Sequence, residues 1–269
     1  MATLKSIPAV LEAAIAEARA RRPDGAVLIG VSGAQGAGKS FHCRQLADAS
    51  NGKVAAFSLD DFYFPKEERE LLAAHRHKLF ITRGPPGTHD LKLAREIIRD
   101  LSHASPNTQL ALPKFDKLKD DRAPKEEWPV FTGRPDAILF EGWCLGAKLP
   151  VTQPDQPVNT LEAQEDPDGS WRAAIEFELG RDYKRFFANW FDDFVFLKAP
   201  SFDVVWQWRE QQQRELLGRP LNTEEITALN RFIQHYERVS SAMIAGDHSA
   251  RWIVHLDENR NVEKVERFD

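Results

Sequence analysis

Residues 26–41 read AVLIGVSGAQGAGKSF, an apolar run followed at once by closely spaced glycines and a Lys-Ser pair. The first six residues do not alternate with polar ones, which is typical of a strand buried on both faces of a parallel sheet. The glycines at 33, 36 and 38 permit tight turns in which successive amides point inward. Phe41 and Leu46 indicate a helix after the pair. The segment therefore predicts a strand, an anion-binding loop and a helix in that order.

The loop matches the pattern G-x-x-x-x-G-K-[ST], which binds nucleoside triphosphates. Lys39 is expected to neutralise the β- and γ-phosphates, and the Ser40 hydroxyl to ligate Mg²⁺ that bridges them. The alternative is a glycine-rich turn in which Lys-Ser is incidental. The predicted nucleotide contacts are Gly33, Ala34, Gln35, Gly36, Ala37, Gly38, Lys39 and Ser40.

Further apolar runs resemble the first, with helical periodicity between them. Spacings of three and four indicate helices around 94–101 and 226–236. Alternation of strands and helices predicts an α/β fold, a doubly wound, mostly parallel sheet flanked by helices. We expect a single domain over residues 1–269, with a surface excursion at about 150–170, where four prolines interrupt any period. The additional strands are predicted at 54–59, 137–140, 194–197 and 252–256.

The composition and net charge of the chain restrict the kinds of partner that we expect. Apolar residues make up 42% and charged residues 29% of the 269, and the formal net charge is -5. A negative chain offers no global positive field for DNA or RNA, so we expect no nucleic-acid partner. Residues 1–22 form an amphipathic pattern, and no run reaches the ~20 apolar residues that span a bilayer. With only two cysteines, we expect a cytoplasmic protein without a membrane partner.

Acidic residues follow two of the predicted strands. Asp60 and Asp61 come at the end of 54–59, where open α/β sheets bind ligands, and such a carboxylate can accept a hydroxyl proton during phosphoryl transfer. Glu141 ends the run at 137–140, where P-loop proteins place an acidic residue toward Mg²⁺. The alternatives are that an aspartate caps a turn, or that Glu141 pairs with a buried base.

Several segments together carry a family resemblance. The sequence resembles the branch of the phosphoribulokinase, uridine kinase and pantothenate kinase superfamily that contains D-glycerate 3-kinase and fungal ATP-dependent kinases. The resemblance implies the P-loop NTPase fold and covers most of residues 26–210. Its segments are GVSGAQGAGKS, SLDDFY, RGPPGTHDL (83–91), LPKFDK (112–117), LFEGWCLG (139–146) and FLKAPSFDVVWQWR (196–209).

The resemblance implies roles for individual residues. Asp60 is the expected general base, with Lys39 and Arg209 as further catalytic residues, and Glu141 joins Ser40 at the magnesium ion. The other acceptor-binding candidates are Asp61, Tyr63, Arg83, His89, Asp90, Lys114 and Arg122.

Four of these candidates have structural alternatives. Asp90 could instead cap the helix around 94–101, and His89 could be a surface-loop histidine. The charges near Lys114 and Arg122 suit an anionic acceptor, but they could equally belong to a solvated loop.

A helical lid is implied at about 203–222. In the superfamily such a lid closes over ATP and contributes arginines to the transferring phosphoryl group. Arg209 is the preferred arginine and Arg214 the second choice, placed as a nucleotide contact. These two lie about 140° apart on a helix, so at least one is expected to be solvated. Trp206 and Trp208 are expected to pack rather than stack on adenine.

The predicted function is transfer of the ATP γ-phosphate, with Mg²⁺, to a small hydroxylated acid, with D-glycerate as the leading candidate by resemblance. Pantothenate, a nucleoside or a sugar are alternative acceptors within the same class. From another class, the chain could be a non-catalytic ATP-binding regulator. A monomer or a homodimer is expected.

Overall fold

The computed structural model describes residues 4–148 and 156–269, and its centre is a six-stranded sheet in the order β10-β9-β8-β1-β7-β2. All neighbours pair in parallel except β10, which pairs antiparallel with β9. The mostly parallel sheet flanked by helices confirms the predicted fold class. The strands are β1 (Val27–Gly33), β2 (Val54–Ser58), β7 (Ala137–Gly142), β8 (Asp193–Lys198), β9 (Trp252–Leu256) and β10 (Val262–Arg267).

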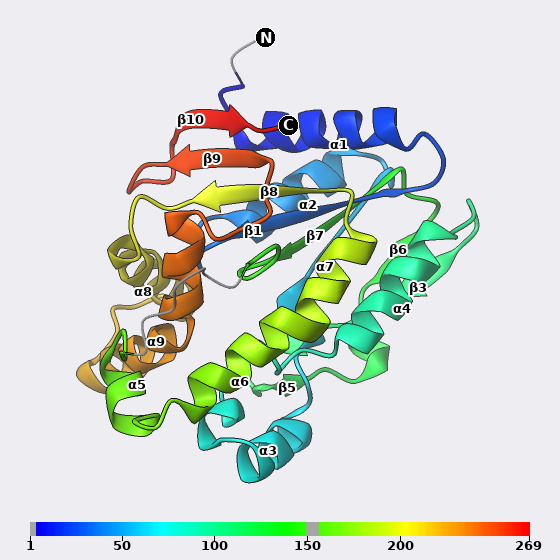
Figure 1. Ribbon diagram of the computed structural model, residues 1–269. Coiled ribbons are helices and arrows are strands. Elements are labelled where there is room, and N and C mark those ends of the chain that lie inside the picture. The colour runs from blue at the N-terminus through cyan, green and yellow to red at the C-terminus, as the bar shows by residue number, and fades with distance from the viewer. Residues whose placement is uncertain (1–3, 149–155) are drawn as a thin grey trace.

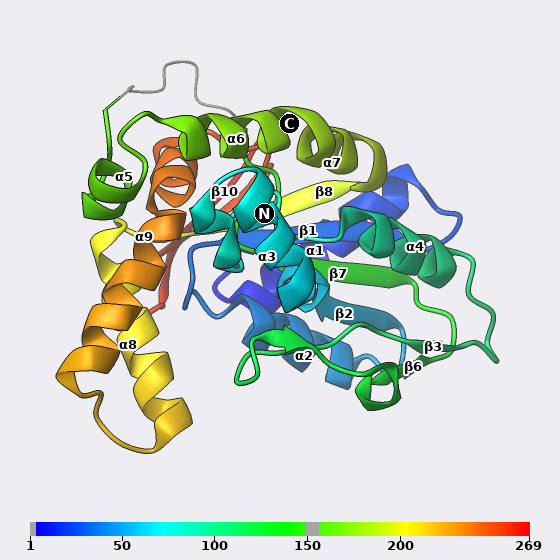
Figure 2. The ribbon, with the colours of Figure 1, turned by 90° about the horizontal axis from the view of Figure 1, so that it is seen from below.

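Helices cover both faces of this sheet (Figures 1 and 2). Every residue of β1 is buried, as its unbroken apolar run predicts. Val27 and Ile29 pack in a core with residues of α1 and α2, whereas Leu28 packs in a second core with α4, α6, α7 and α9. The helices are α1 (Ile7–Arg21), α2 (Lys39–Ala49), α3 (Lys66–His75), α4 (Leu91–Ser102), α5 (Thr160–Glu165), α6 (Ser170–Glu178), α7 (Lys184–Trp190), α8 (Asp203–Leu217) and α9 (Thr223–Ala245).

The carboxyl ends of β1, β7 and β2 lie side by side. Glu141 of β7 is in register with Val31 of β1 on one side and with Ser58 of β2 on the other. Loops that leave these strands therefore share one edge of the sheet, which is where open α/β sheets bind ligands.

Two short antiparallel pairs of strands lie beside the sheet. One pairs β3 (Gln109–Ala111) with β6 (Val130–Thr132), and the other pairs β4 (Phe115–Asp116) with β5 (Asp121–Arg122). At this carboxyl edge, α8 and α9 contact each other and project as a hairpin from the sheet (Figure 2). The helix α8 occupies most of the segment where a lid was expected.

The predicted excursion is only partly described. Residues 150–155 lie outside the described part, and α5 follows them. Leu161, Glu162 and Asp166 are buried, and Glu162 accepts hydrogen bonds of 2.9 and 2.6 Å from Arg238 of α9. The later part of the segment is therefore anchored to α9 and is not purely a surface loop.

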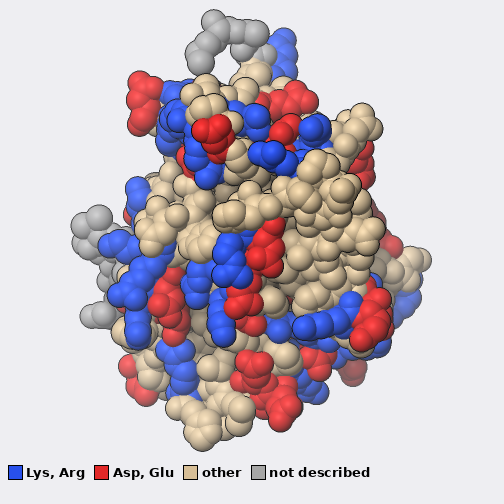
Figure 3. All heavy atoms as spheres, turned by 90° about the vertical axis from the view of Figure 1, so that its right-hand side faces the viewer, with Lys and Arg blue, Asp and Glu red and all other residues tan. Residues whose placement is uncertain are grey.

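On the face shown in Figure 3, Lys and Arg are interspersed with Asp and Glu. Among the described residues, no helix combines the length and apolarity needed to cross a membrane.

Candidate active site

The glycine-rich loop curls between β1 and α2. Gly36 and Gly38 have φ angles of 80° and 89°, in the left-handed region that favours glycine. Lys39 begins α2, and its ammonium donates to the carbonyl oxygens of Gly33 at 2.8 Å and Ala34 at 3.0 Å. Burial lowers the pKa of Lys39, although the negative charges of nearby carboxylates oppose this effect. The loop thus holds a buried cation beside the N-terminus of a helix, an arrangement suited to phosphate.

The helix α8 rests directly on this loop. A Cβ atom at Gly36 would lie 2.6 Å from the Cβ of Trp208, so only glycine permits the contact. Arg260 donates from Nε to the Gly36 carbonyl oxygen at 2.7 Å and from Nη1 to Gln211 of α8 at 3.0 Å. A cavity of about 360 Å³ opens here, lined by Gly36, Gly38, Lys39, Ser40, Phe41, His42, Trp208, Gln211, Gln212, Glu215 and Arg260.

Ser40 and Glu141 meet at the edge of this loop. The Ser40 hydroxyl donates to Glu141 Oε1 at 2.6 Å, and Glu141 is buried at the end of β7. Both side chains present hard oxygen atoms next to the phosphate loop, which fits Mg²⁺, an ion that usually takes one or two protein ligands together with phosphates. The predicted metal pair is therefore brought together.

Asp60 lies one turn beyond β2, in the short 3₁₀ helix η1 (Leu59–Phe62). Tyr63 donates its hydroxyl to Asp60 Oδ1 at 2.7 Å, and Lys117 donates to Oδ2 at 2.6 Å. Burial opposes ionisation of Asp60, but the Lys117 ammonium and these hydrogen bonds outweigh it. The pKa of Asp60 is consequently held well below its usual range.

A small cavity of about 80 Å³ joins Asp60 to the phosphate loop. Four cationic side chains from different elements line this cavity, and aromatic residues of α9 and of the loop after β7 complete its wall. Its charged members are Lys39, Asp60, Arg83, Lys117, Glu141 and Arg209, and the others are Gln35, Gly36, Ser40, Tyr63, Trp143, Gln212, Phe232 and Tyr236. A volume this small, with an excess of positive charge, suits a compact anion.

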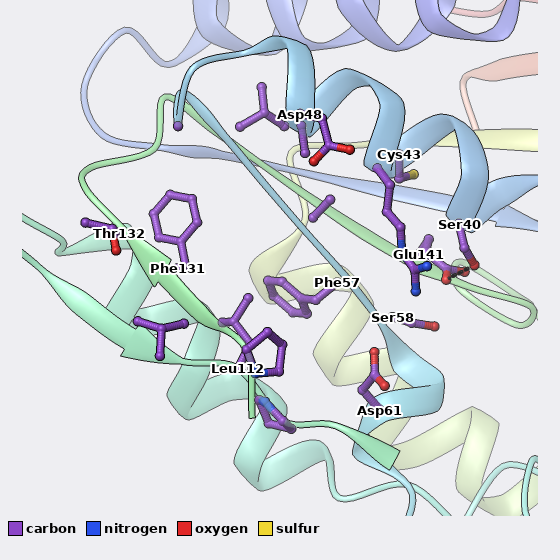
Figure 4. Close-up of a pocket in the computed structure, with 18 residues that line it drawn as sticks. Ser40, Cys43, Asp48, Phe57, Ser58, Asp61, Leu112, Phe131, Thr132 and Glu141 are labelled. Atoms are coloured by element: carbon purple, nitrogen blue, oxygen red, sulfur yellow. Dashed lines mark hydrogen bonds between the residues drawn. The ribbon is translucent and has the colours of Figure 1, made fainter. Parts of the chain in front are cut away.

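Asp61 faces a different space. It lines a cleft of about 650 Å³ that runs along the free edge of β2, between α2 and β6, and reaches Ser40 and Glu141 at one end (Figure 4). The Phe115 amide donates to Asp61 at 3.3 Å. Burial raises the pKa of Asp61 to about 6, and this hydrogen bond only partly offsets it. The two adjacent carboxylates therefore serve separate cavities.

His89 and Asp90 do not line the small cavity. Asp90 accepts a hydrogen bond of 2.9 Å from the Leu93 amide, so it caps α4, which is the structural alternative considered for it. His89 is 3% exposed and not a surface histidine, because its ring lies 4.8 Å from that of Tyr63 and its Nδ1 lies 2.6 Å from the Tyr183 hydroxyl. Burial lowers the pKa of His89 to about 3. His89 thus supports Tyr63, the partner of Asp60.

The basic acceptor candidates separate in space. Arg83 lines the small cavity and pairs with Asp120. Lys114 is exposed, and Arg122 donates to the Tyr63 carbonyl at 2.9 Å and to Asp90 at 3.4 Å, outside the cavity. Lys114 and Arg122 therefore hold the loop around Asp60 or face solvent, so the solvated-loop alternative fits part of this segment.

The arginines of α8 also differ. Arg209 lines the small cavity, while Arg214 is exposed, as the helical geometry predicted for one of the two. Arg219 pairs with Glu225 at 2.7 Å. Trp208 is 2% exposed and donates its indole N–H to the Glu258 carbonyl at 2.7 Å, so its packing role is confirmed.

Some residues of the site carry no local sequence signal. Arg260 comes from the turn between β9 and β10, far along the chain from the loop that it contacts. Phe232 and Tyr236 lie on the face of α9 that its helical period already marked as apolar, so a core position was the natural interpretation. Only the folded arrangement brings them to the cavity.

Comparisons with known proteins agree with this geometry. The chain is 29% identical over 232 residues to a protein named uncharacterized kinase mug58 of Schizosaccharomyces pombe, covering 80% of each chain. It is 28% identical over 257 residues to the chloroplastic D-glycerate 3-kinase of Arabidopsis thaliana, covering 87% of this chain and 53% of the relative. No family model matches the chain.

A solved structure is also similar to this chain. The structure of the YGR205w protein superposes with a TM-score of 0.70 at 26% identity, covering 97% of this chain and 96% of the other. This chain resembles the D-glycerate 3-kinase branch of the P-loop kinases. Its kinase relatives support a phosphotransferase that uses ATP and a small-molecule substrate.

Proposed function

We propose that this protein transfers the γ-phosphoryl group of ATP to a hydroxyl group of a small hydroxylated acid, with D-glycerate as the first candidate. The observation that carries the proposal is the position of Asp60. Its carboxylate lies in a compact cavity that opens onto the phosphate loop and holds four cationic side chains. A relative named D-glycerate 3-kinase supports the choice of acid.

The nucleotide would occupy the larger cavity between the loop and α8. Its phosphates would meet Lys39 and the amides of residues 33–40, and the ring would extend toward Phe41, His42 and Arg260. Arg209 lines the small cavity, from which it would stabilise the charge that develops on the transferring group. Arg214 remains the second candidate of the lid, available only if α8 moves.

Mg²⁺ would be held by Ser40 and Glu141 together with phosphate oxygens and water. When bound, it supplies neutralisation of the charge that develops between the β- and γ-phosphates. The chain's own contribution is to hold these two oxygen ligands 2.6 Å apart at the mouth of the loop.

The transfer step needs one proton acceptor. The acceptor hydroxyl gives its proton to Asp60 as its oxygen forms a bond to the γ-phosphorus, and the bond from that phosphorus to the bridging oxygen of ADP breaks. Lys39 and Arg209 stabilise the charge that moves to the leaving group and the equatorial oxygens. Burial keeps water from competing as the acceptor.

Larger acceptors are a second candidate class. The cleft of about 650 Å³ beside Asp61 also reaches Ser40 and Glu141, so it has room for pantothenate or a nucleoside. A non-catalytic ATP-binding regulator would leave the carboxylate of Asp60 without a use.

An assay of ADP release across acceptors tests these proposals. We expect acceptor-dependent turnover with D-glycerate to exceed that with pantothenate, uridine and ribose. Turnover with uridine or pantothenate but none with D-glycerate would move the acceptor to the larger cleft. ATP binding without turnover for any acceptor would favour the regulator.

A further inference from the structure

The Lys117 ammonium lies where the hydroxyl group of an acceptor would have to approach Asp60 to give up its proton. It lies 2.6 Å from Asp60 Oδ2, while Tyr63 bonds the other oxygen at 2.7 Å. A carboxylate that is bound to an ammonium is a weak base, because its charge is already stabilised. In this arrangement Asp60 is protected from the alcohol and from water alike.

The Lys117 side chain lies on a turn at the surface, where it has room to change its position. Lys117 belongs to the turn between β4 and β5, and its side chain is 54% exposed, in contrast with the buried Lys39. The acid of the same turn, Asp116, accepts from the amides of Leu118 and Lys119 and pairs with the Lys119 ammonium at 3.5 Å. In the described part of the chain, the recorded ion-pair partner of Lys117 is therefore Asp60.

Among the described residues, no other cation of the cavity has a recorded ion pair with Asp60. Arg83 pairs with Asp120, and its guanidinium lies 5.6 Å from the ring centres of both Phe115 and Phe232. Lys39 is tethered to the phosphate loop, whereas Arg209 lines the same small cavity, donates to Gln212 and lies 5.8 Å from the centre of the Phe232 ring. Lys117 is the cation that lies on Asp60 itself, so a carboxylate that recruits it also frees an oxygen atom of the base.

We infer that Lys117 selects anionic acceptors and releases Asp60 when one binds. This rests on the proposed function. The acceptor's carboxylate takes the Lys117 ammonium, and its hydroxyl takes the place of that ammonium at Oδ2. Asp60 then regains its basicity only beside the correct substrate. An uncharged alcohol or a water molecule leaves the lysine on Asp60 and the base blocked.

Kinetics of Lys117→Met, with Lys119→Met as the matched control from the same turn, test this. D-glycerate is compared with glycerol, which keeps both hydroxyl groups of D-glycerate and has a hydroxymethyl group in place of the carboxylate. We expect Lys117→Met to raise the KM for D-glycerate by roughly 10- to 100-fold, the effect of losing a hydrogen bond to a charged group. Its kcat/KM for glycerol and its acceptor-free ATP hydrolysis should be equal to or above wild type. Lys119→Met should match wild type in all three.

A titration separates this inference from the proposed function. Carbon NMR of aspartate carboxyl groups, assigned with Asp60→Asn, reports the pKa of Asp60 without any acceptor. The charged and titratable groups around it are Lys39, Asp61, Tyr63, Arg83, Lys117, Asp120, Glu141, Arg209 and Tyr236.

We expect this pKa to rise in Lys117→Met, and also in wild type on addition of D-glycerate. Lys117→Arg, which keeps the charge, should retain most of the preference for D-glycerate.

The outcomes are distinct. One outcome is that the wild type turns over D-glycerate while Lys117→Met shows the same KM for D-glycerate and the same ratio of kcat/KM for D-glycerate to kcat/KM for glycerol. This result would overturn the role of Lys117 and leave the kinase proposal intact. The role of Lys117 would also be overturned if the pKa of Asp60 changed neither in Lys117→Met nor on addition of D-glycerate. No turnover of any hydroxy acid by wild type would overturn both proposals.

Discussion

Ser40 and Glu141 are joined by a hydrogen bond of 2.6 Å although 101 positions separate them in the chain. One belongs to the first turn of α2 and the other to the end of β7, so the sheet itself brings a hydroxyl and a carboxylate together. The pair is organised by the fold before any ligand arrives, and pre-organised ligands bind without a further cost of ordering.

Substitution of this pair should weaken the response to magnesium. In Ser40→Ala or Glu141→Gln, we expect the Mg²⁺ concentration for half-maximal turnover to rise by roughly tenfold or more, because the first change removes an oxygen ligand and the second removes the negative charge of the carboxylate. Ser102→Ala, whose hydroxyl bonds only a helix carbonyl of α4, is the control. Magnesium titrations of turnover identical in all three variants would exclude the pair as the metal site.

Gly36→Ala should damage the contact between loop and lid. The added Cβ would meet Trp208 at 2.6 Å, and the φ of 80° is strained for alanine. Gly133→Ala is a matched control, because its φ of 105° is also positive but nothing lies within 4 Å of the new atom. Both should lose roughly 1 kcal/mol of stability through the strained backbone, and Gly36→Ala should lose more because of the clash with Trp208. Only Gly36→Ala should raise the KM for ATP; equal KM values would show that α8 does not need to touch the loop.

Asp61→Asn should stabilise the protein above neutral pH. The folded pKa of about 6 lies above the ordinary value of 3.8, so the fold favours the neutral acid, and stability is lost as pH rises through this interval. We expect a gain of up to about 3 kcal/mol at pH 8 that disappears near pH 4. Denaturant unfolding at both pH values, with the exposed Asp48→Asn as control, measures it. A gain that is independent of pH would contradict the assignment.

The two lid arginines should differ sharply. Arg209→Met should lower kcat by roughly 10²-fold, because its guanidinium lines the catalytic cavity, whereas Arg214→Met should leave kcat within about threefold of wild type. Single-turnover kinetics with saturating ATP compare them. The reverse order would mean that α8 rotates or moves on closure and brings Arg214 to the phosphoryl group.

Sequence patterns predicted the framework because they reflect burial. The apolar runs at 26–31 and 137–140 lie within central strands, and the glycine spacing produced the expected loop. The strand β10 was not predicted, because VEKVER is a largely polar edge strand with one exposed face. Hairpins with strands of two and three residues are too short to create a period.

The site was predicted less completely, for a physical reason. Motifs identify Lys39, Ser40, Asp60 and Glu141, whose neighbours along the chain fix them. The contact of Lys117 with Asp60 spans 57 positions and depends on a hairpin folding over η1, which no local spacing records. We propose that residues 1–269 act as a single domain, because α5 and α9 are tied by the buried Glu162–Arg238 pair.

Asp60→Asn tests the central claim most directly. Asparagine keeps the shape and accepts the Tyr63 hydrogen bond but cannot take a proton. We predict that kcat with D-glycerate falls by roughly 10²- to 10⁴-fold, while the Kd for MgATP stays within about threefold of wild type. Asp48→Asn should change neither quantity. Turnover by Asp60→Asn at the wild-type rate would contradict the account, because the carboxylate at the end of β2 would then not be the base.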